Sequence, residues 1–253
     1  MSENIELHDL LKYFPIESQS GPSDKAFLLA SRALVSELKQ NYSYVEVGSY
    51  LGGSLTPFLM DPLCTLVLSI DERERQLPDE RGANFDYAGI TNQTMIDKLQ
   101  VCGISTDKLK TFDGSVDAMG SPAQTFDLGF IDGEHTDFAC FRDFLWLLPM
   151  MNPDAIVVFH DSTLVYKALR LIQLYLRKSG LKFRFMKKTN SDMTALFFGK
   201  FAEVDLPAIF GAEDNPEEFY ATAESTLISH LVTNRCEVQF SVKVNPPKTK
   251  PAF

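Results

Sequence analysis

The sequence predicts an α/β fold built on a doubly wound, mostly parallel sheet of seven strands, with helices on both faces and a C-terminal antiparallel hairpin. Short apolar runs, rich in β-branched and aromatic residues, recur along the chain. Helical patterns or long connections separate the first five of these runs, as parallel pairing requires. Only the short polar segment 189–192 separates the last two, which indicates a hairpin.

The N-terminal half carries the first two expected strands. Residues 24–41 repeat apolar side chains at helical spacing, and Asp24 can cap this helix. Residues 42–48 (YSYVEVG) are the first expected strand, and the glycine turn in LGGSLTPFLM (51–60) leads into a helix. Residues 64–71 (CTLVLSID) are the second strand, and residues 92–102 form a helix that ends at Gly103.

The C-terminal half supplies the other five strands. LKTFDG (109–114) is a weaker third strand, and FDLGFI (126–131) and AIVVF (155–159) are the fourth and fifth. Helices are expected over 137–148, with Asp137 as the N-cap, and over 163–180, which Gly180 ends. Residues 181–188 and 193–201 form the hairpin.

Two regions lie outside this alternation. Residues 72–90 form a long polar connection, and connections of that length usually carry function or lack order. The part after Phe201 contains an expected helix (216–233), a candidate strand in EVQFSV (237–242) and a proline–lysine end. We therefore divide the chain into an N-terminal helical segment (1–40), a core (41–201) and a C-terminal extension with tail (202–253).

Composition narrows the class of protein. The net charge of −10 argues against a nucleic-acid partner. The N-terminus lacks the pattern of a secretory signal, and no apolar run is long enough to cross a membrane. Four scattered cysteines form no CxxC pair, which favours reduced thiols and a cytoplasmic location.

Charge is segregated between two segments. Residues 167–188 contain eight Lys and Arg and no acidic residue, whereas residues 203–224 contain seven Asp and Glu and no basic residue. We favour the interpretation that both are solvated faces that pack against each other. The alternative is a site for an anionic substrate.

The first strand runs into a glycine turn, YVEVGSYLGGSL (44–55). Tyr50 stands where a dinucleotide fingerprint needs its second glycine, so that fingerprint is absent. Gly48 lets the backbone approach a ligand closely, and Gly52 and Gly53 complete the turn. Ser54 and the helix N-terminus can donate to a carboxylate, while Glu46 can recognise an ammonium group. These groups suit the amino-acid end of a ligand.

The second strand ends in Asp71, roughly 20 residues after the glycines, where nucleotide-binding α/β folds place the acid that binds ribose hydroxyls. A ligand with both an amino-acid end and a ribose suggests S-adenosylmethionine (SAM).

The motifs in this order resemble those of class I SAM-dependent methyltransferases, in particular the catechol O-methyltransferase-like and sugar O-methyltransferase branch. VEVGSYLGGS resembles the first motif of that family, in which the tyrosine, here Tyr50, often lies near the transferred methyl group. LSIDERE resembles the second motif, and DGSVDA (113–118) resembles the adenine loop, with Asp113, Ser115 and Val116 as cofactor-binding residues. The resemblance covers roughly residues 40–200; it implies a Rossmann-like fold and is compatible with a homodimer.

Two expected strands end in polar residues, Asp132 and Asp161. The resemblance implies that the strands are neighbours and that both carboxylates face one pocket, where they could bind Mg²⁺ and where Asp132 could also contact SAM. The family completes its site with an oxygen ligand beside the second aspartate, but His160 and Ser162 stand there. His160 would favour a softer ion such as Mn²⁺. The alternative is that Asp132 orders the SAM loop while His160 and Asp161 form local hydrogen bonds.

Methyl transfer to a hydroxyl also needs a base. Members of the family carry one at the offset of Glu134 or of His135, and we favour His135 because an imidazole titrates near neutral pH. The alternative for His135 is a structural role at the start of the next helix.

The sequence therefore predicts a SAM-dependent O-methyltransferase, assisted by a divalent cation, that acts on a hydroxylated small molecule such as a sugar, a glycosylated natural product or a catechol. The alternatives are a metal-independent methyltransferase acting on another nucleophile, and a SAM-binding subunit without catalysis. A nicotinamide oxidoreductase ranks last because the glycine spacing is wrong.

Overall fold

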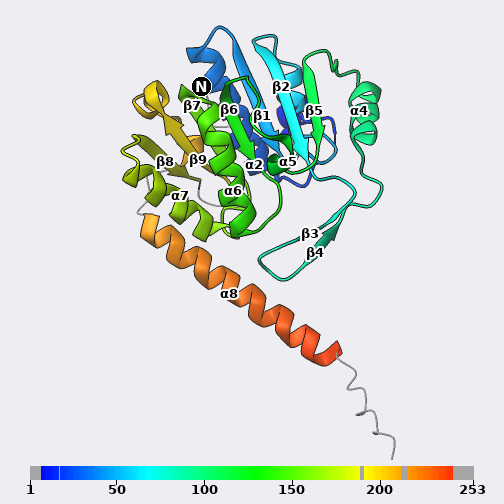
Figure 1. The fold of residues 1–253 in the computed structure, drawn as a ribbon, viewed down its shortest axis with the longest axis vertical. Helices are drawn as coiled ribbons and strands as arrows, with labels where there is room; N and C mark the ends of the chain where they lie inside the picture. The colour runs from blue at the N-terminus through cyan, green and yellow to red at the C-terminus, as the bar shows by residue number, and fades with distance from the viewer. Residues whose placement is uncertain (1–6, 17, 189–190, 212–215, 242–253) are drawn as a thin grey trace, which may run out of the picture.

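The computed structural model describes residues 7–241, apart from residues 17, 189–190 and 212–215. Its centre is a seven-stranded sheet with the order β5-β2-β1-β6-β7-β9-β8 (Figure 1). The strands are β1 (Tyr42–Val47), β2 (Cys64–Asp71), β5 (Leu109–Asp113), β6 (Phe126–Ile131), β7 (Met151–Phe159), β8 (Phe183–Lys187) and β9 (Thr194–Phe198).

The first five strands of the sheet are parallel, and the last two form an antiparallel hairpin. β1 pairs with β2 and β6, β2 with β5, and β6 with β7, all in parallel, while β9 runs antiparallel to both β7 and β8. The predicted fold class is therefore confirmed. The order reverses between β1 and β6, and ligands in open α/β sheets bind beyond the carboxyl ends of the strands at such a switch point.

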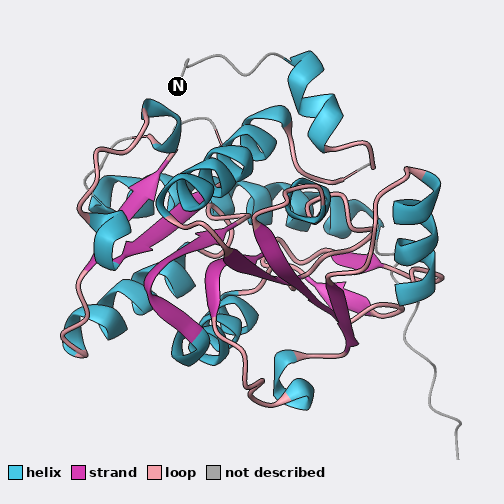
Figure 2. Cartoon of the chain, turned by 90° about the horizontal axis from the view of Figure 1, so that it is seen from above, coloured by secondary structure: helices cyan, strands magenta, loops and turns pink. Residues whose placement is uncertain are grey.

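Helices cover both faces of the sheet, as the view from above shows (Figure 2). Four helices contribute to the apolar cluster on one face: α1 (Leu7–Tyr13), α2 (Pro22–Leu38), α3 (Thr56–Leu59) and α4 (Asn92–Val101). Four contribute to the cluster on the other face: α5 (Val116–Met119), α6 (Asp137–Leu147), α7 (Tyr166–Lys178) and α8 (Pro216–Ser241). None of these described helices is both long enough and apolar enough to cross a bilayer.

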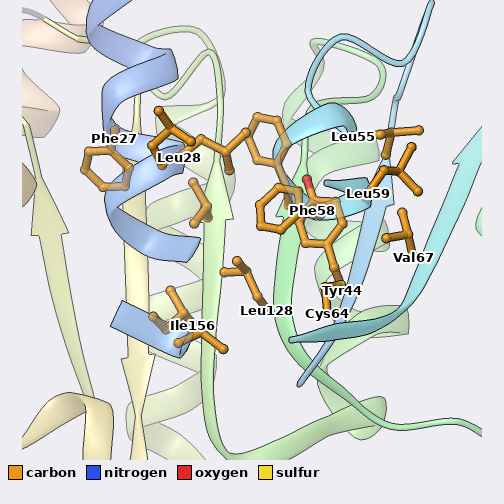
Figure 3. Close-up of a cluster of buried hydrophobic side chains, with 14 of the residues drawn as sticks. Phe27, Leu28, Tyr44, Leu55, Phe58, Leu59, Cys64, Val67, Leu128 and Ile156 are labelled. Carbon is orange, nitrogen blue, oxygen red and sulfur yellow. The ribbon is translucent and has the colours of Figure 1, made fainter. Parts of the chain in front are cut away.

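The strands bury side chains in both directions because each face has a helical cover. In β6, Leu128 and Phe130 join the cluster of α2 and α3, while Phe126 and Ile131 join that of α6 and α7. Figure 3 shows the first cluster, in which Leu128 and Ile156 lie between Phe27 of α2 and Phe58 of α3. Alternating apolar side chains therefore fix the register of each strand and the position of its carboxyl end.

The structure corrects three expectations. The N-caps of α2 and α6 are Gly21 and Thr136, and not Asp24 and Asp137. The candidate strand in EVQFSV is wrong over residues 237–241, because α8 runs without a break from Pro216 to Ser241, and Val242 lies outside the described residues. An alternation of only six residues fits a helical continuation equally well, and no glycine or proline interrupts α8 after its first residue. The 72–90 connection contains a small antiparallel hairpin, β3 (Gln76–Pro78) and β4 (Asn84–Asp86). The proline–lysine end lies outside the described residues.

The two oppositely charged segments meet where α7 packs against α8. Arg170 Nη2 lies 3.1 Å from Glu217 Oε2, and its guanidinium lies 5.8 Å from the Tyr220 ring centroid. This contact agrees with two packed faces, but it involves only part of the basic segment. The lysines at the end of β8 do not take part in it and are considered below.

Candidate active site

A trough crosses the carboxyl ends of β1, β2 and β6. The space between the walls of its main cavity, open solvent included, is about 590 Å³. A second cavity of about 320 Å³ shares four lining residues with it, so the two form one trough. Eight of the predicted cofactor residues line this trough. The main cavity is lined by Gly48, Tyr50, Gly53, Ser54, Asp71 and Asp132, and the smaller cavity adds Ser115 and Val116.

Gly48 is required by the meeting of two strand ends. Its φ is +89°, and a Cβ at this position would lie 2.0 Å from the carbonyl oxygen of Asp132. The backbone continues the sheet on both sides, because Gly48 donates to Ile70 and Asp132 donates to Val47, each at 2.8 Å. Only glycine combines this conformation with this approach, which leaves the floor of the trough as bare backbone.

Asp71 and Tyr50 join the glycine turn to the second strand. The backbone amide of Tyr50 donates to Asp71 Oδ2 at 2.6 Å, and Tyr50 holds a positive φ of 46°. Burial raises the pKa of Asp71, although the nearby Arg73 guanidinium opposes this. The Tyr50 ring meets Tyr87, which follows β4, with centroids 5.6 Å apart. The polar connection thus supplies one wall of the trough.

Arg73 is a site residue that sequence reasoning missed. Its side chain is 2% exposed yet lines the main cavity. Its guanidinium reaches Asp113 Oδ1 at 2.7 Å and Ser69 Oγ at 3.1 Å, while Nε has no hydrogen-bond partner. The only signal was a basic residue two positions after the strand-end acid, and such a residue is usually solvated. The buried cation lies where a ligand with hydroxyl or carboxylate groups would meet it.

Three of the predicted cofactor residues are not among the lining residues. Asp113 pairs with Arg73 instead, and Gly52 turns the loop with a φ of +82° beside Met95. Glu46 is fully buried below the trough, where its carboxyl accepts hydrogen bonds from Tyr44, at 2.5 Å, and from Ser54. Glu46 is therefore not part of the lining, although its hydrogen-bond partner Ser54 is. Recognition of an ammonium group by Glu46, directly or through water, stays a prediction.

Burial gives Glu46 a testable effect on stability. It raises the pKa of this carboxyl to about 8, although Ser54 and Tyr44 oppose the shift. The folded protein therefore holds this proton more tightly than the unfolded chain. The resulting stabilisation is complete below about pH 4.5 and is lost as the pH rises to about 8, by up to ~1.4 kcal/mol per pH unit.

We expect Glu46→Gln to remove that part of the pH dependence, since glutamine cannot ionise. Urea unfolding of both proteins between pH 5 and pH 9, without ligand, measures this. Between about pH 5 and pH 8 the free energy of unfolding of the wild type should fall relative to that of the variant, and above about pH 8 the difference should level off. Parallel curves would show that Glu46 is already ionised in the folded protein.

The two predicted bases line different cavities of the trough. Glu134 lines the smaller cavity together with Ser115 and Val116, and it accepts a hydrogen bond from Thr136. His135 lines the main cavity instead. Of the two candidate bases, only His135 belongs to the polar cluster described next.

Six side chains form a carboxylate–imidazole cluster at the ends of β6 and β7. His135 Nε2 lies 3.0 Å from Asp161 Oδ2, and His160 Nδ1 lies 3.1 Å from the same oxygen. His160 Nδ1 is also 3.0 Å from Asp132 Oδ1, and its Nε2 is 3.6 Å from Asp24. On the other side of His135, Nδ1 lies 3.4 Å from Asp79. The cluster comprises Asp24, Asp79, Asp132, His135, His160 and Asp161.

Opposite charges dominate this cluster. Burial disfavours a charged imidazole, but hydrogen bonds to Asp161 and Asp79 outweigh it and raise the pKa of His135 to about 10. His135 and His160 together hold the pKa of Asp161 well below its usual range, although burial opposes this shift. Asp161 is thus the carboxylate that both imidazoles share, and it adopts a positive φ of 48°.

Within the described residues, Asp132, His135 and Asp161 form the group that could hold a metal ion, with ligand atoms all within 4.8 Å of one another. The set predicted from the sequence contained His160 in place of His135. The structure puts His160 within reach of both carboxylates, with its other nitrogen directed to Asp24. Two carboxylate oxygens with one imidazole suit Mn²⁺ or another divalent ion of intermediate softness.

The sequence of residues 45–162 matches the model of a family described as a methyltransferase domain. That span contains the glycine turn, Asp71 and all of the cluster except Asp24. Among curated proteins, no sequence matches this chain.

Three solved structures illustrate the similarity of fold. The O-methyltransferase NovP has a TM-score of 0.56 at 11% identity, with 70% of this chain and 80% of that one covered. TomG from Streptomyces achromogenes, in complex with SAM, has a TM-score of 0.50 at 14% identity, over 75% and 86%. An O-methyltransferase from Bacillus cereus in complex with SAH has a TM-score of 0.50 at 14% identity, over 76% and 90%.

Proposed function

We propose that this chain is a methyltransferase that transfers the methyl group of SAM to a hydroxyl of a small molecule, as the match of residues 45–162 to a methyltransferase-domain family supports. The observation that carries the proposal is the trough at the switch point between β1 and β6, which ends against the carboxylate–imidazole cluster. A cofactor in the trough and an acceptor at the cluster would then meet at Asp132 and His135, which line the trough and belong to the cluster. NovP and TomG are O-methyltransferases by description, which supports oxygen as the acceptor atom.

The trough fits SAM in the character of its groups. The bare backbone at Gly48 admits a ligand closely, and Ser54 and the turn amides face the end where an amino acid would bind. Asp71 lies between that end and the Ser115–Val116 end, as the acid for a ribose should. The unused donor of buried Arg73 gives the site a further polar contact.

Asp132, His135 and Asp161 are the residues that would hold a divalent cation. A bound cation would lower the pKa of an acceptor hydroxyl and fix its position. Two observations support the fit of a cation here: the chemical types of the three donor groups, and their location beside the trough. The protein's own contribution is to keep the three ligand atoms together, with Asp79 as a charged neighbour of His135 at 3.4 Å and His160 as a neighbour of Asp132 and Asp161.

SAM would supply a methyl group on a sulfonium. The acceptor oxygen would attack the methyl carbon in line, so that a C–O bond forms while the C–S bond breaks and S-adenosylhomocysteine leaves. The residues of the chain must align that oxygen, exclude water and accept its proton. Alignment alone can contribute ~7–11 kcal/mol to lowering the barrier. In our proposal the acceptor oxygen lies beside His135 Nε2, which would be one of the cation's ligands. In its neutral form His135 would take the proton of the acceptor hydroxyl. The neighbouring carboxylates raise the pKa of His135 to about 10 and so hold most of it protonated near neutral pH, and turnover without a cation should therefore increase with pH.

Isothermal titration with S-adenosylhomocysteine, with and without Mn²⁺ or Mg²⁺, tests the proposal first. We expect micromolar binding to the wild type, and binding at least tenfold weaker in Asp71→Ala. Asp107→Ala, on an exposed turn, is the control and should bind as the wild type does. If folded protein shows no binding, the proposed function is wrong. If turnover of hydroxylated sugars or catechols survives EDTA, the cation is not required.

Asp79 provides a separate prediction about the polar connection. Its side chain is fully buried and pairs with Arg81 Nη2 at 2.6 Å, with His135 on its other side. Asp79→Asn keeps the shape but removes the charge that orients the imidazole, so kcat should fall about tenfold to a hundredfold. Asp86→Asn, on the exposed side of the same hairpin, serves as the control. An unchanged kcat and pH profile in Asp79→Asn would contradict the orienting role.

A further inference from the structure

A third cavity lies on the far side of Asp161 from the cofactor trough. It encloses about 1,870 Å³, largely open to solvent, between the first turn of α2, the end of β8 and α8. Asp161 lines it and also belongs to the cluster, so the cavity leads to the place where methyl transfer would occur. An acceptor larger than its reacting hydroxyl would extend into this space.

Lys187, the last residue of β8, lines this cavity although it is only 9% exposed. Its ammonium donates to the carbonyl oxygen of Ser191 and lies 5.4 Å from the Phe219 ring centroid. No carboxylate of the described residues lies within 4.0 Å of it, and burial lowers the pKa of this lysine to about 8. A buried ammonium with one neutral acceptor retains donors for an anion.

The same cavity receives the N-terminus of α2. Gly21, Pro22 and Ser23 line it at the positive end of the dipole of a 17-residue helix. Pro22 has no amide hydrogen, and the Gly21 amide donates to the Asp24 carboxylate of the same turn, so the dipole is the contribution of this helix end. Lys188 Nζ, 3.5 Å from the Ser23 carbonyl, adds a second ammonium beside this turn. Two independent features, a buried cation and a helix N-terminus, therefore favour negative charge in one place.

The acids that line the cavity are largely occupied by other groups. Asp24 accepts from Gly21 at 3.0 Å and from Ser191 at 2.7 Å, and it faces His160. Asp192 accepts from Thr163 at 2.7 Å, and Asp161 is shared by the two histidines. Glu218 lines the wall formed by α8, and it is the acid that an entering anion would have to pass.

Strand register relates Lys187 to the cluster. Thr194 of β9 pairs with Lys187 on one side and with Phe159, the residue before His160, on the other. Two strand spacings separate the backbones of Phe159 and Lys187, about 10 Å. One small molecule can therefore place a hydroxyl at Asp161 and an anionic group at Lys187.

We propose that the acceptor of this enzyme carries a carboxylate or phosphate group, and that Lys187, Lys188 and the first turn of α2 bind this group while the hydroxyl lies at Asp161. The inference rests on the proposed function for the identity of the reacting end. The anion site itself can be tested without SAM. It also assigns a role to part of the basic segment that α8 does not neutralise.

Titration with phenyl phosphate and with benzoate tests the site directly. We expect saturable binding of at least one probe with a Kd below about 1 mM, weakened at least tenfold in Lys187→Met and retained within about threefold in Lys187→Arg. Lys182→Met removes an exposed lysine just before β8 and should bind as the wild type does. The tighter probe identifies the acceptor's group as phosphate or carboxylate.

A second readout guards against a folding defect. After reductive ¹³C-methylation of lysines, the resonance absent from Lys187→Met should move during the titration, while that of Lys182 should not. Absence of saturable binding to the wild type, or equal affinity in Lys187→Met, overturns the anion site. That result leaves S-adenosylhomocysteine binding untouched. Loss of S-adenosylhomocysteine binding with the anion site intact would instead refute the proposed function alone.

Discussion

Asp161→Asn is expected to lower kcat on the order of a thousandfold while the affinity for S-adenosylhomocysteine stays within about twofold. Asp161 Oδ2 is within 3.1 Å of nitrogens from both His135 and His160, so the amide would leave the two imidazoles without their shared charge. It would also weaken the hold on a cation. Asp161 does not line the cofactor trough, which is why cofactor affinity should remain.

Asparagine is the suitable replacement because it tolerates the positive φ of 48° at this position. Asp154→Asn makes the same change near the opposite end of β7 and should leave kcat unchanged. Single-turnover and steady-state assays on a responsive hydroxylated acceptor measure the effect. An unchanged kcat in Asp161→Asn would show that the cluster takes no part in methyl transfer. Loss of S-adenosylhomocysteine binding would show that Asp161 shapes the trough.

Gly48→Ala is expected to weaken S-adenosylhomocysteine binding more than a hundredfold and to lower the free energy of unfolding by about 2–4 kcal/mol. The added methyl would lie 2.0 Å from the Asp132 carbonyl oxygen, so the ends of β1 and β6 must separate. That separation displaces the floor of the trough and Asp132 together.

Gly103→Ala separates crowding from backbone strain. Gly103 also has a positive φ, of 71°, but a Cβ there meets nothing within 4 Å. Gly103→Ala should lower the free energy of unfolding by only about 1–2 kcal/mol and leave ligand binding unchanged. Thermal melts and isothermal titration of both variants give the comparison. Equal destabilisation of the two would mean that the β1–β6 junction can relax around the methyl group.

The sequence predicted the core strands closely because each is a short apolar run buried on both faces. FDLGFI corresponds to β6 without adjustment, and CTLVLSID to β2. Less of the C-terminal extension could be predicted. Its last candidate strand belongs to α8, because a short alternation cannot be distinguished from the continuation of a helix that began upstream.

Candidate site residues that follow strand ends can be predicted from the sequence, since parallel strands bring their carboxyl ends to one edge. Gly48, Asp71, Asp132 and Asp161 are predicted in this way, and the structure brings all four to that edge of the sheet. Side chains that arrive from other elements could not be predicted in this way. Asp79 reaches His135 from the β3–β4 hairpin, and Arg73 turns inward although charged residues at such positions are usually solvated.

The sequence by itself determined the strand–helix order, the strand-end carboxylates and imidazoles, and the glycine where two strands meet, because these depend on local pattern and on sheet topology. Only the tertiary structure decided which nitrogen faces which carboxylate. It also decided that Glu46 is buried beneath the trough, and that Lys187 and the start of α2 share one cavity. These relations depend on packing between residues far apart in the chain, where burial and charge, and not spacing, set each side chain's position.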